Sequence, residues 1–232
     1  MSWIKYIEKP VVKEPIAIVG SPGLRSVGKI VVDYLIEELK PRLVAELYSK
    51  HFPILYQTRP SYVSHPDYPG QAGTLLKGGK VELPKVEFHL STYPELLITK
   101  GYHANFNGQY EVAHKILDFY QKFGVKRMIV TAGYGREGKD VCCAATDLEL
   151  IKELKKYDID IGYEGPFYGF SGLVFGLGML REIKGICLFG KTQPSLEDPE
   201  YPDPKAAKAV LEILSRMLNL TVDLSKLEKR AE

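Results

Sequence analysis

Short apolar runs that alternate with amphipathic helical segments restrict this chain to the α/β class of folds. The first run, residues 16–19, is rich in β-branched side chains, as is typical of a strand buried on both faces. It ends in the turn 20–23, and a helical pattern follows until Pro41 stops it. Strand, glycine-containing turn and helix form the opening of a βαβ unit, which predicts parallel pairing with a later strand.

The same alternation returns in the second half of the chain. Strands are expected at 96–99, 127–131, 159–163 and 186–189. Helices are expected around 112–123, 148–157, 171–183 and 204–218, with Thr146 as the expected N-cap of the second. We therefore predict one domain over residues 1–232, a three-layer α/β/α sandwich with a mostly parallel sheet.

Residues 43–90 have a different character. Short strand candidates at 43–48, 74–77 and 86–90 alternate with loops rich in proline and glycine, and no helical period is present. This pattern predicts an antiparallel insertion or flanking strands beside the parallel sheet.

One helix start is specified more completely than the others. Asp203 can cap the first backbone N–H groups, and Pro204 suits the first helical position because its missing donor costs nothing there. Apolar residues then recur with a period of 3.6, and Asn219 can end the helix in a left-handed conformation.

Charge and composition limit the partners of the chain. The 31 basic and 29 acidic residues among 232 are interspersed, so a net charge of +2 gives no reason to expect nucleic acid. The most apolar run, 170–180, is half of what a ~20-residue membrane span needs. We expect a cytoplasmic protein without a membrane contact. Three cysteines make no disulfide framework, and five histidines show no zinc spacing, so no metal or other cofactor is expected.

The turn after the first strand is the first candidate for ligand chemistry. Glycines there could let backbone amides approach an anion. The turn has neither the dinucleotide-binding spacing nor a P-loop, and close packing of Gly28 on the sheet is the favoured explanation of its glycines. Residues that could line a ligand cleft at this end of the sheet are Gly20, Ser21, Gly23, Arg25, Ser26, Arg136, Glu164 and Thr192.

Catalytic residues are not evident. Cys142 or Cys143 could pair with His103 or His114 as nucleophile and base, but a small buried thiol is the favoured interpretation. The carboxylates at the expected strand ends are Glu137, Asp140, Asp147 and Glu164, of which Asp147 suits a helix cap. We expect no catalytic residue and therefore no enzyme.

The segment 165–180 is apolar nearly all round, which is typical of a helix in the core or in a subunit contact. Its glycines at 172, 176 and 178 reduce helix stability by about 0.5–1 kcal/mol each relative to alanine. Close approach of another backbone is the usual compensation. The aromatic residues expected to form a protein interface are Tyr62, Tyr68, Phe167, Tyr168 and Phe170.

Several blocks, in order, resemble the archaeal branch of the proteasome assembly chaperone family. They are Gly20-Ser21-Pro22-Gly23 with Val27-Gly28 and Tyr34-Leu35, Ala144-Ala145-Thr146 with Leu148-Glu149-Leu150, Ser171-Gly172, and 185–190 running to Tyr201-Pro202-Asp203-Pro204-Lys205-Ala206-Ala207. The last string is the most diagnostic. The resemblance implies an α/β/α sandwich similar to nucleoside phosphorylases and a homo-oligomeric, ATP-independent chaperone or scaffold, with no catalytic residues to carry over.

The partners that this resemblance implies are further copies of the chain and proteasome α subunits or another assembly factor. Some archaeal relatives dock on the proteasome with a C-terminal tail of a hydrophobic residue, tyrosine and any residue, whereas this chain ends Lys229-Arg230-Ala231-Glu232. The alternative function is a small-molecule binder or enzyme of nucleoside phosphorylase or hydrolase type, using the cleft residues named above.

Overall fold

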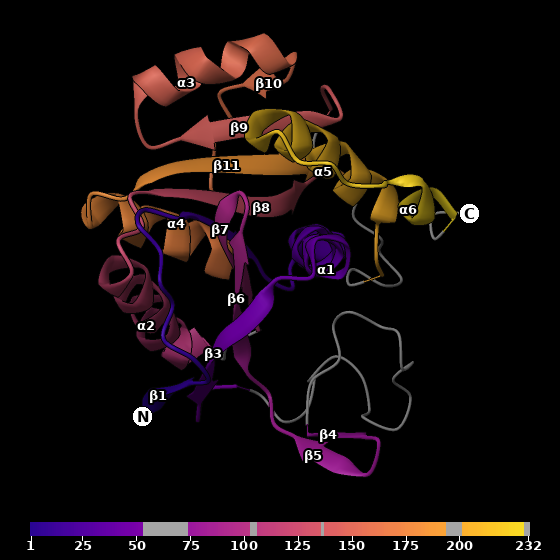
Figure 1. The fold of residues 1–232 in the computed structure, drawn as a ribbon. Coiled ribbons are helices and arrows are strands. Elements are labelled where there is room, and N and C mark those ends of the chain that lie inside the picture. Colours follow the sequence, from indigo (N-terminus) through magenta and orange to yellow (C-terminus); the bar gives the residue numbers. More distant parts are fainter. Residues whose placement is uncertain (53–73, 103–105, 136, 194–200, 230–232) are drawn as a thin grey trace.

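A computed structural model describes residues 1–52, 74–102, 106–135, 137–193 and 201–229. Within these residues, nine strands form one sheet in the order β1-β3-β6-β7-β2-β8-β11-β9-β10, and β4 and β5 form a separate hairpin (Figure 1). The strands of the sheet are β1 (Ser2–Tyr6), β2 (Ile16–Gly20), β3 (Arg42–Ser49), β6 (Val86–Thr92), β7 (Glu95–Lys100), β8 (Arg127–Tyr134), β9 (Val141–Ala145), β10 (Asp160–Ile161) and β11 (Lys184–Lys191). The hairpin strands are β4 (Leu75–Lys77) and β5 (Lys80–Glu82).

Six α-helices are described in these parts of the chain. They are α1 (Val27–Leu39), α2 (Gln109–Lys122), α3 (Leu148–Leu154), α4 (Phe170–Leu180), α5 (Pro204–Leu218) and α6 (Ser225–Lys229). Helices α2 and α4 pack together on one side of the sheet, and α1 and α5 pack together on the other. The predicted α/β/α layering is confirmed.

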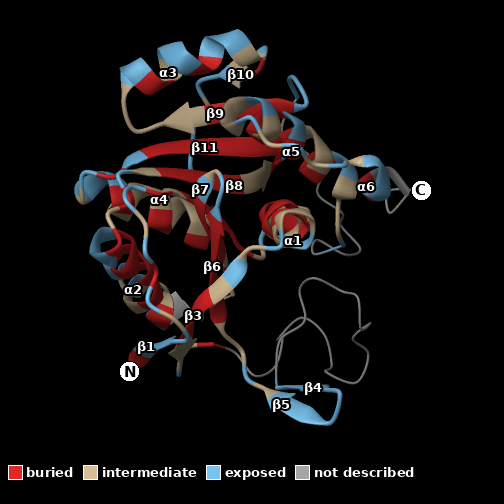
Figure 2. Cartoon of the chain, viewed as in Figure 1, coloured by how far each residue is buried: buried red, intermediate tan, exposed pale blue. Residues whose placement is uncertain are grey.

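The centre of the sheet is parallel. Strand β2 pairs in parallel with β7 on one side and β8 on the other, and β8 pairs in parallel with β11. Alternate residues of these strands serve two cores: Ile18 packs beneath α1 and α5, whereas Ala17 and Val19 face α2 and α4. The central strands are therefore buried on both faces (Figure 2), which explains their continuous apolar sequences.

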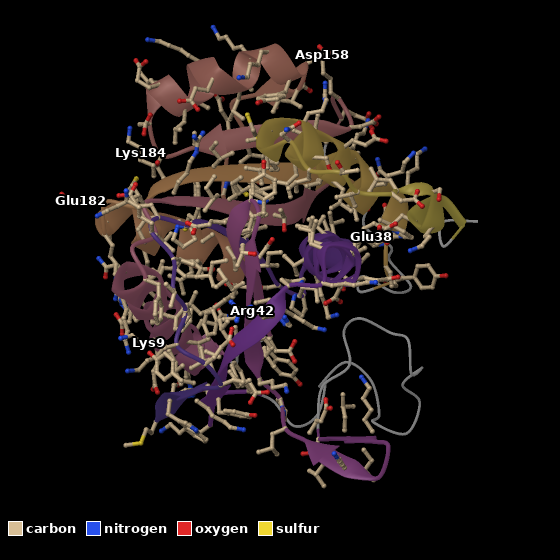
Figure 3. All side chains as sticks on the ribbon, in the orientation of Figure 1. Lys9, Glu38, Arg42, Asp158, Glu182 and Lys184 are labelled. Atoms are coloured by element: carbon tan, nitrogen blue, oxygen red, sulfur yellow. The ribbon has the colours of Figure 1, made fainter. Side chains whose placement is uncertain are left out.

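The predicted antiparallel region extends this sheet. Strands β3 and β6 pair antiparallel with each other, and β6 pairs antiparallel with β7. They are flanking strands of the main sheet, and the β4–β5 hairpin projects from the body beside them (Figure 1). The charged residues Asp158 and Glu182 lie at the periphery of the molecule (Figure 3).

Some local predictions were wrong. Strands β1 and β9 were not predicted. Strand β9 has a weak sequence signal, because Val141–Ala145 combines two cysteines with two alanines and is held as a strand by β11 and β10 on either side. Asp147, and not Thr146, caps α3, and its carboxylate accepts a hydrogen bond from the backbone N–H of Leu150 at 3.0 Å. Thr146 instead pairs with Gly185, whose N–H donates to its hydroxyl at 2.9 Å.

The predicted start of α5 is confirmed in detail. The carboxylate of Asp203 accepts a hydrogen bond from the Ala206 N–H at 2.9 Å, and Pro204 occupies the first turn. Asn219 ends the helix with φ of 52°. The apolar face, which includes Val210, Leu211 and Leu214, is buried in the core beneath α5.

Candidate functional site

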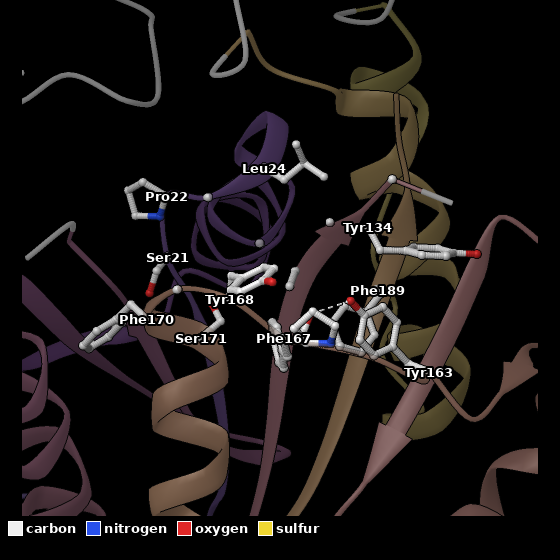
Figure 4. Close-up of a pocket in the computed structure, with 17 residues that line it drawn as sticks. Ser21, Pro22, Leu24, Tyr134, Tyr163, Phe167, Tyr168, Phe170, Ser171 and Phe189 are labelled. Carbon is white, nitrogen blue, oxygen red and sulfur yellow. Dashed lines mark hydrogen bonds between the residues drawn. The ribbon is translucent and has the colours of Figure 1, made fainter. Parts of the chain in front are cut away.

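A cavity of 310 Å³ opens beyond the carboxyl ends of β2 and β8, where α/β proteins commonly place ligands. One wall is the turn after β2, and another is the segment 163–171 that leads into α4 (Figure 4). The cavity is lined by Ser21, Pro22, Gly23, Leu24, Gly28, Ala132, Gly133, Tyr134, Gly135, Tyr163, Pro166, Phe167, Tyr168, Gly169, Phe170, Ser171 and Phe189. Two groups predicted separately, the ligand-cleft residues Ser21 and Gly23 and the aromatic residues Phe167, Tyr168 and Phe170, line this cavity together.

The turn between β2 and α1 is tightly packed and strained. A Cβ atom on Gly28 would lie 2.1 Å from the Thr131 carbonyl oxygen, and one on Gly20 would lie 2.0 Å from the Gly28 carbonyl oxygen. These contacts confirm that Gly28 lets the helix approach the sheet closely. Arg25 and Ser26 both have left-handed backbone conformations, with φ of 50° and 52°. Such strain in non-glycine residues concentrates at functional sites.

Aromatic side chains form much of the cavity wall. The Tyr163 and Phe189 rings are stacked with centroids 4.8 Å apart, and Phe167 meets Phe189 edge to face, also at 4.8 Å. Tyr168 is 82% exposed, and Figure 4 shows its ring among the lining residues. The wall thus combines a packed aromatic base with one tyrosine available to an incoming molecule.

Two predicted cleft residues have a structural role beside this cavity. Arg25 donates hydrogen bonds from Nε to the Tyr201 carbonyl oxygen at 2.5 Å and from its guanidinium to the Gln193 carbonyl oxygen at 2.7 Å. Thr192 donates to Asp203 at 2.5 Å. Both residues line a neighbouring hollow of 420 Å³, and both hold residues 201–203 near the end of the sheet.

Glu164 lies in a third hollow, of 350 Å³, together with Asp160 and Cys142. Tyr134 and Tyr163 line both this hollow and the aromatic cavity. Burial, together with the adjacent Cys142 thiol, raises the pKa of the Tyr134 hydroxyl well above its usual range.

The cysteines are buried thiols. Burial raises the pKa of Cys143 to about 11 and that of Cys187 well above its usual range. A thiol needs a lowered pKa to act as a nucleophile at neutral pH. His114 lies on α2, where its Nδ1 is 2.6 Å from Arg181, and His103 lies outside the described residues. The raised pKa values therefore argue against Cys143 and Cys187 as nucleophiles.

The described residues include no group of three or more histidine, cysteine, aspartate or glutamate side chains placed to hold a metal ion. Among the described helices, none has both the length and the apolar character that a membrane crossing requires.

The predicted interface residues differ in exposure. Phe170 is buried and Phe167 is half-buried, so Tyr168 is the aromatic residue of that segment which faces solvent. Tyr62, Tyr68 and Arg136 lie outside the described residues. The assignment of these residues to an interface or a cleft stays a prediction.

Sequence reasoning missed several lining residues. Tyr134 ends β8 and Phe189 lies near the end of β11, so the rule that ligands lie at carboxyl ends of parallel strands could have found both. Ser171 is in the first turn of α4, a position that the expected helix already included. Their convergence on one cavity depends on strand order, which the sequence alone does not state.

Fold and site together describe a three-layer α/β protein with an aromatic cleft at the strand ends. The chain belongs to the PAC2 family, which it matches over residues 17–232. This membership confirms the resemblance drawn from the ordered sequence blocks.

Solved structures and a curated relative extend the comparison. Pyrococcus furiosus PbaB, described as an archaeal proteasome activator, is 32% identical with a TM-score of 0.81, covering 99% of this chain and 94% of PbaB. P. furiosus PbaA, described as an archaeal homolog of proteasome-assembly chaperone, shares the fold with 24% identity and a TM-score of 0.75 over 98% of this chain and 91% of PbaA. An uncharacterized Methanocaldococcus jannaschii protein, MJ1210, is 31% identical over 93% of this chain and 78% of its own length.

Proposed function

We propose that this chain is a homo-oligomeric, ATP-independent assembly chaperone or scaffold that acts on proteasome α subunits in the cytoplasm. The observation that carries the proposal is the likeness to PbaB, a proteasome activator, at 32% identity over 99% of this chain. Such a protein acts through protein–protein contacts, and PAC2 membership supports binding in preference to catalysis. The raised pKa values of the buried Cys143 and Cys187 thiols support the same preference.

The outer face of α4 is the surface that we assign to self-association. The inner face of this helix, with Phe170 and Val174, packs in the core. Met179 and Leu180, on the opposite side, are 50% and 75% exposed. With Gly172 and Gly176 they follow the i, i+4, i+7, i+8 spacing of a single helix face. An apolar helix face open to solvent is typical of a protein contact.

The two glycines of this face have different surroundings. A Cβ atom on Gly172 would lie 2.4 Å from the Phe167 carbonyl oxygen, so the fold of the chain itself requires glycine there. Beyond the neighbouring backbone of α4 itself, a Cβ atom on Gly176 would have no described heavy atom within 4 Å. Glycine in a helix costs about 1 kcal/mol relative to alanine, and no contact among the described residues offsets that cost at Gly176. Close approach of a second subunit supplies the missing reason.

The oligomer is tested by native mass measurement of purified protein at micromolar concentration. We expect a single species of several subunits for the wild type and a shift to the monomer for Leu180→Arg, which places a charge in the contact. Leu148→Arg is the matched control, because Leu148 is 76% exposed on α3. A monomeric wild type, or a Leu180→Arg variant that assembles like the control, would contradict self-association through α4.

The partner is tested by capture of proteasome α subunits on the immobilised chain. We expect specific capture of equal amount with and without ATP, because the proposed contact needs no nucleotide hydrolysis. If α subunits from the native lysate do not bind, the proposal that the chain acts on proteasome α subunits is contradicted. If they bind only in the presence of ATP, the proposal of ATP-independent binding is contradicted.

A further inference from the structure

The β4–β5 hairpin is an arm with an uncovered apolar face. It projects from the body of the molecule, and Figure 2 shows its two strands largely exposed. Leu76 and Val81 are direct partners across the hairpin, and they are 78% and 66% exposed. A hairpin of two strands alone is marginally stable in water. A second molecule on this face would therefore supply stability that the described residues do not.

The sequence specifies the turn of this hairpin closely. Gly78 and Gly79 have positive φ angles of 56° and 75°, as the two central residues of a type I′ turn require. A turn of this type matches the twist of the strands on either side of it. The arm is therefore a defined structure, although nothing among the described residues covers it.

The tip of the arm carries two lysines at a cost to the hairpin. Lys77 lies directly opposite Lys80, and like charges in that position destabilise a pair of strands. Both lysines are exposed, and neither makes an ion pair with another described residue. An acidic surface on a second molecule would offset their repulsion.

The 350 Å³ hollow beside β10 has the complementary charge. Glu137, Asp160 and Glu164 line it, and its described lining residues include no lysine or arginine. Glu137 pairs with Lys191 at 3.0 Å, but its side chain is 89% exposed and stays accessible to a further cation. Exposed Ile161 adds apolar surface to the same hollow. Strand β10 is also the last strand of the sheet, so its outer edge has no neighbouring strand among the described residues.

The arm and the hollow lie at opposite ends of the molecule. Strand β10 ends the sheet, whereas the hairpin follows β3 and precedes β6 near the other end. In Figure 1, β10 is at the top and the hairpin is at the bottom, so an arm is far from the hollow of its own chain. A contact between the two surfaces therefore joins two chains head to tail. Such heterologous contacts form rings when the rotation between subunits closes.

We propose that the β4–β5 hairpin docks on a second copy of this chain. Lys77 and Lys80 enter the acidic hollow of the neighbour, and the apolar face of the arm lies against Ile161 at the edge of β10. The proposal rests on the proposed self-association and adds a second contact to it, because α4 supplies an apolar surface elsewhere. Charge complementarity of this kind mainly gives specificity, so the arm determines which end of one chain meets which end of the next.

Charge reversal with rescue tests this contact by native mass measurement over a dilution series of the full chain. Lys77→Glu with Lys80→Glu replaces one like-charge pair by another, so the hairpin should keep its stability while its attraction to the hollow becomes repulsion. We expect the dissociation constant of the assembly to rise at least about tenfold. Glu137→Lys with Glu164→Lys should have the same effect. The chain with all four changes should recover its assembly, because complementarity returns with the signs exchanged.

Lys9→Glu with Lys13→Glu is the matched control, because both lysines are exposed and the net charge changes equally. This variant should assemble like the wild type. If the wild type assembles and the Lys77→Glu, Lys80→Glu variant assembles equally tightly, the hairpin contact is overturned while self-association through α4 stands. Failure of the fourfold change to restore assembly would also overturn the hairpin contact. A monomeric wild type overturns both.

Carbodiimide cross-linking identifies the contact directly when unlabelled and ¹⁵N-labelled chains are mixed before assembly. The reagent joins a lysine amine to a carboxylate that is already in contact with it. We expect mass spectrometry to find Lys77 or Lys80 of one isotope joined to Glu137, Asp160 or Glu164 of the other. These cross-links should be lost at high salt, because the screening length falls from about 10 Å at 0.1 M to about 3 Å at 1 M. Assembly without any such mixed cross-link at low salt would overturn the proposal.

Discussion

Thr192 donates a hydrogen bond to Asp203 over 2.5 Å, and this contact joins the end of β11 to the start of α5. The other carboxylate oxygen of Asp203 accepts from the Ala206 N–H at 2.9 Å. The Asp203 N–H in turn donates to the Arg25 carbonyl oxygen at 3.0 Å. One aspartate therefore connects a strand end, a helix cap and the turn before α1.

Because Asp203 makes all three contacts, substitution of this residue should lower the stability of the fold strongly. We expect Asp203→Ala to lower the free energy of unfolding by about 2–3 kcal/mol, because it removes a helix cap and leaves a nearly buried Thr192 hydroxyl without its partner. The measurement is urea denaturation followed by circular dichroism.

The control for this change is Asp147→Ala, because Asp147 caps α3 through one hydrogen bond to the Leu150 N–H. Asp147→Ala should lower the free energy of unfolding by only about 1 kcal/mol, the usual value for a lost cap. Equal losses in the two variants would mean that the bond to Thr192 contributes nothing.

Gly28→Ala should destabilise the protein severely. The new Cβ atom would lie 2.1 Å from the Thr131 carbonyl oxygen, and neither α1 nor β8 can move without disturbing the core. We expect a loss of about 3 kcal/mol or more, measured by denaturant titration.

Gly23→Ala is the matched change in the same turn. Gly23 has an extended backbone with φ of −170°, and the nearest heavy atom to an added Cβ is 4.0 Å away. Its stability should stay within about 0.5 kcal/mol of the wild type. A similar loss of stability in both variants would mean that the turn itself requires glycine, and would contradict the explanation by close contact of the helix with the sheet.

Glu87 makes stability depend on pH in the acid range. Burial alone would raise the pKa of this carboxyl, but the hydrogen bond with His89 and the nearby Lys100 and Lys85 ammonium groups lower it from 4.5 to about 2. A depressed folded-state pKa stabilises the folded state above the unfolded-state value, and this contribution is lost as pH falls from about 5 to about 2. The loss is at most about 3 kcal/mol.

Glu87→Gln removes this titrating group while keeping a similar shape. Urea denaturation at pH 6, 4 and 3 should give a shallower pH dependence in the variant than in the wild type. Parallel curves for the two proteins would contradict the assigned role of Glu87.

The Cys143 and Cys187 thiols should resist alkylation in the folded protein. Both are buried, and burial raises the pKa of each, so little thiolate is present at pH 8. Iodoacetamide labelling followed by mass spectrometry should modify them rapidly in urea and slowly in buffer. Rapid native labelling of Cys143 would revive the possibility of a reactive thiol.

Local sequence rules predicted the elements whose causes are local. The strand at residues 16–19 was predicted as buried on both faces because each side chain there is apolar. Helix α5 was predicted correctly because Asp203 and Asn219 define its ends. Strand β9 was missed because its pairing partners lie in β10 and, much farther along the chain, in β11, and its two cysteines and two alanines do not favour a strand.

The part of the candidate site that depends on local sequence was also predictable. Ser21 and Gly23 follow a parallel strand directly, and that position alone pointed to the cleft. Arg25 has a left-handed backbone and donates to the Tyr201 and Gln193 carbonyl oxygens, contacts far apart in sequence that no local pattern indicates. The Arg25 guanidinium also lies over the Tyr201 ring, 5.8 Å from its centroid, and this contact supplies a reason for a tyrosine in the diagnostic string.

The position of β2 between β7 and β8 governs the order in which the chain can fold during synthesis. Strand β2 leaves the ribosome early, yet its second neighbour begins only at Arg127. At 5–20 residues per second, this central strand stays without that neighbour for roughly 5–20 s. During that interval the unpaired N–H and C=O groups along this edge of β2 are open to pairing with other chains. Productive folding of the protein is therefore expected to begin late, after β8 has been made.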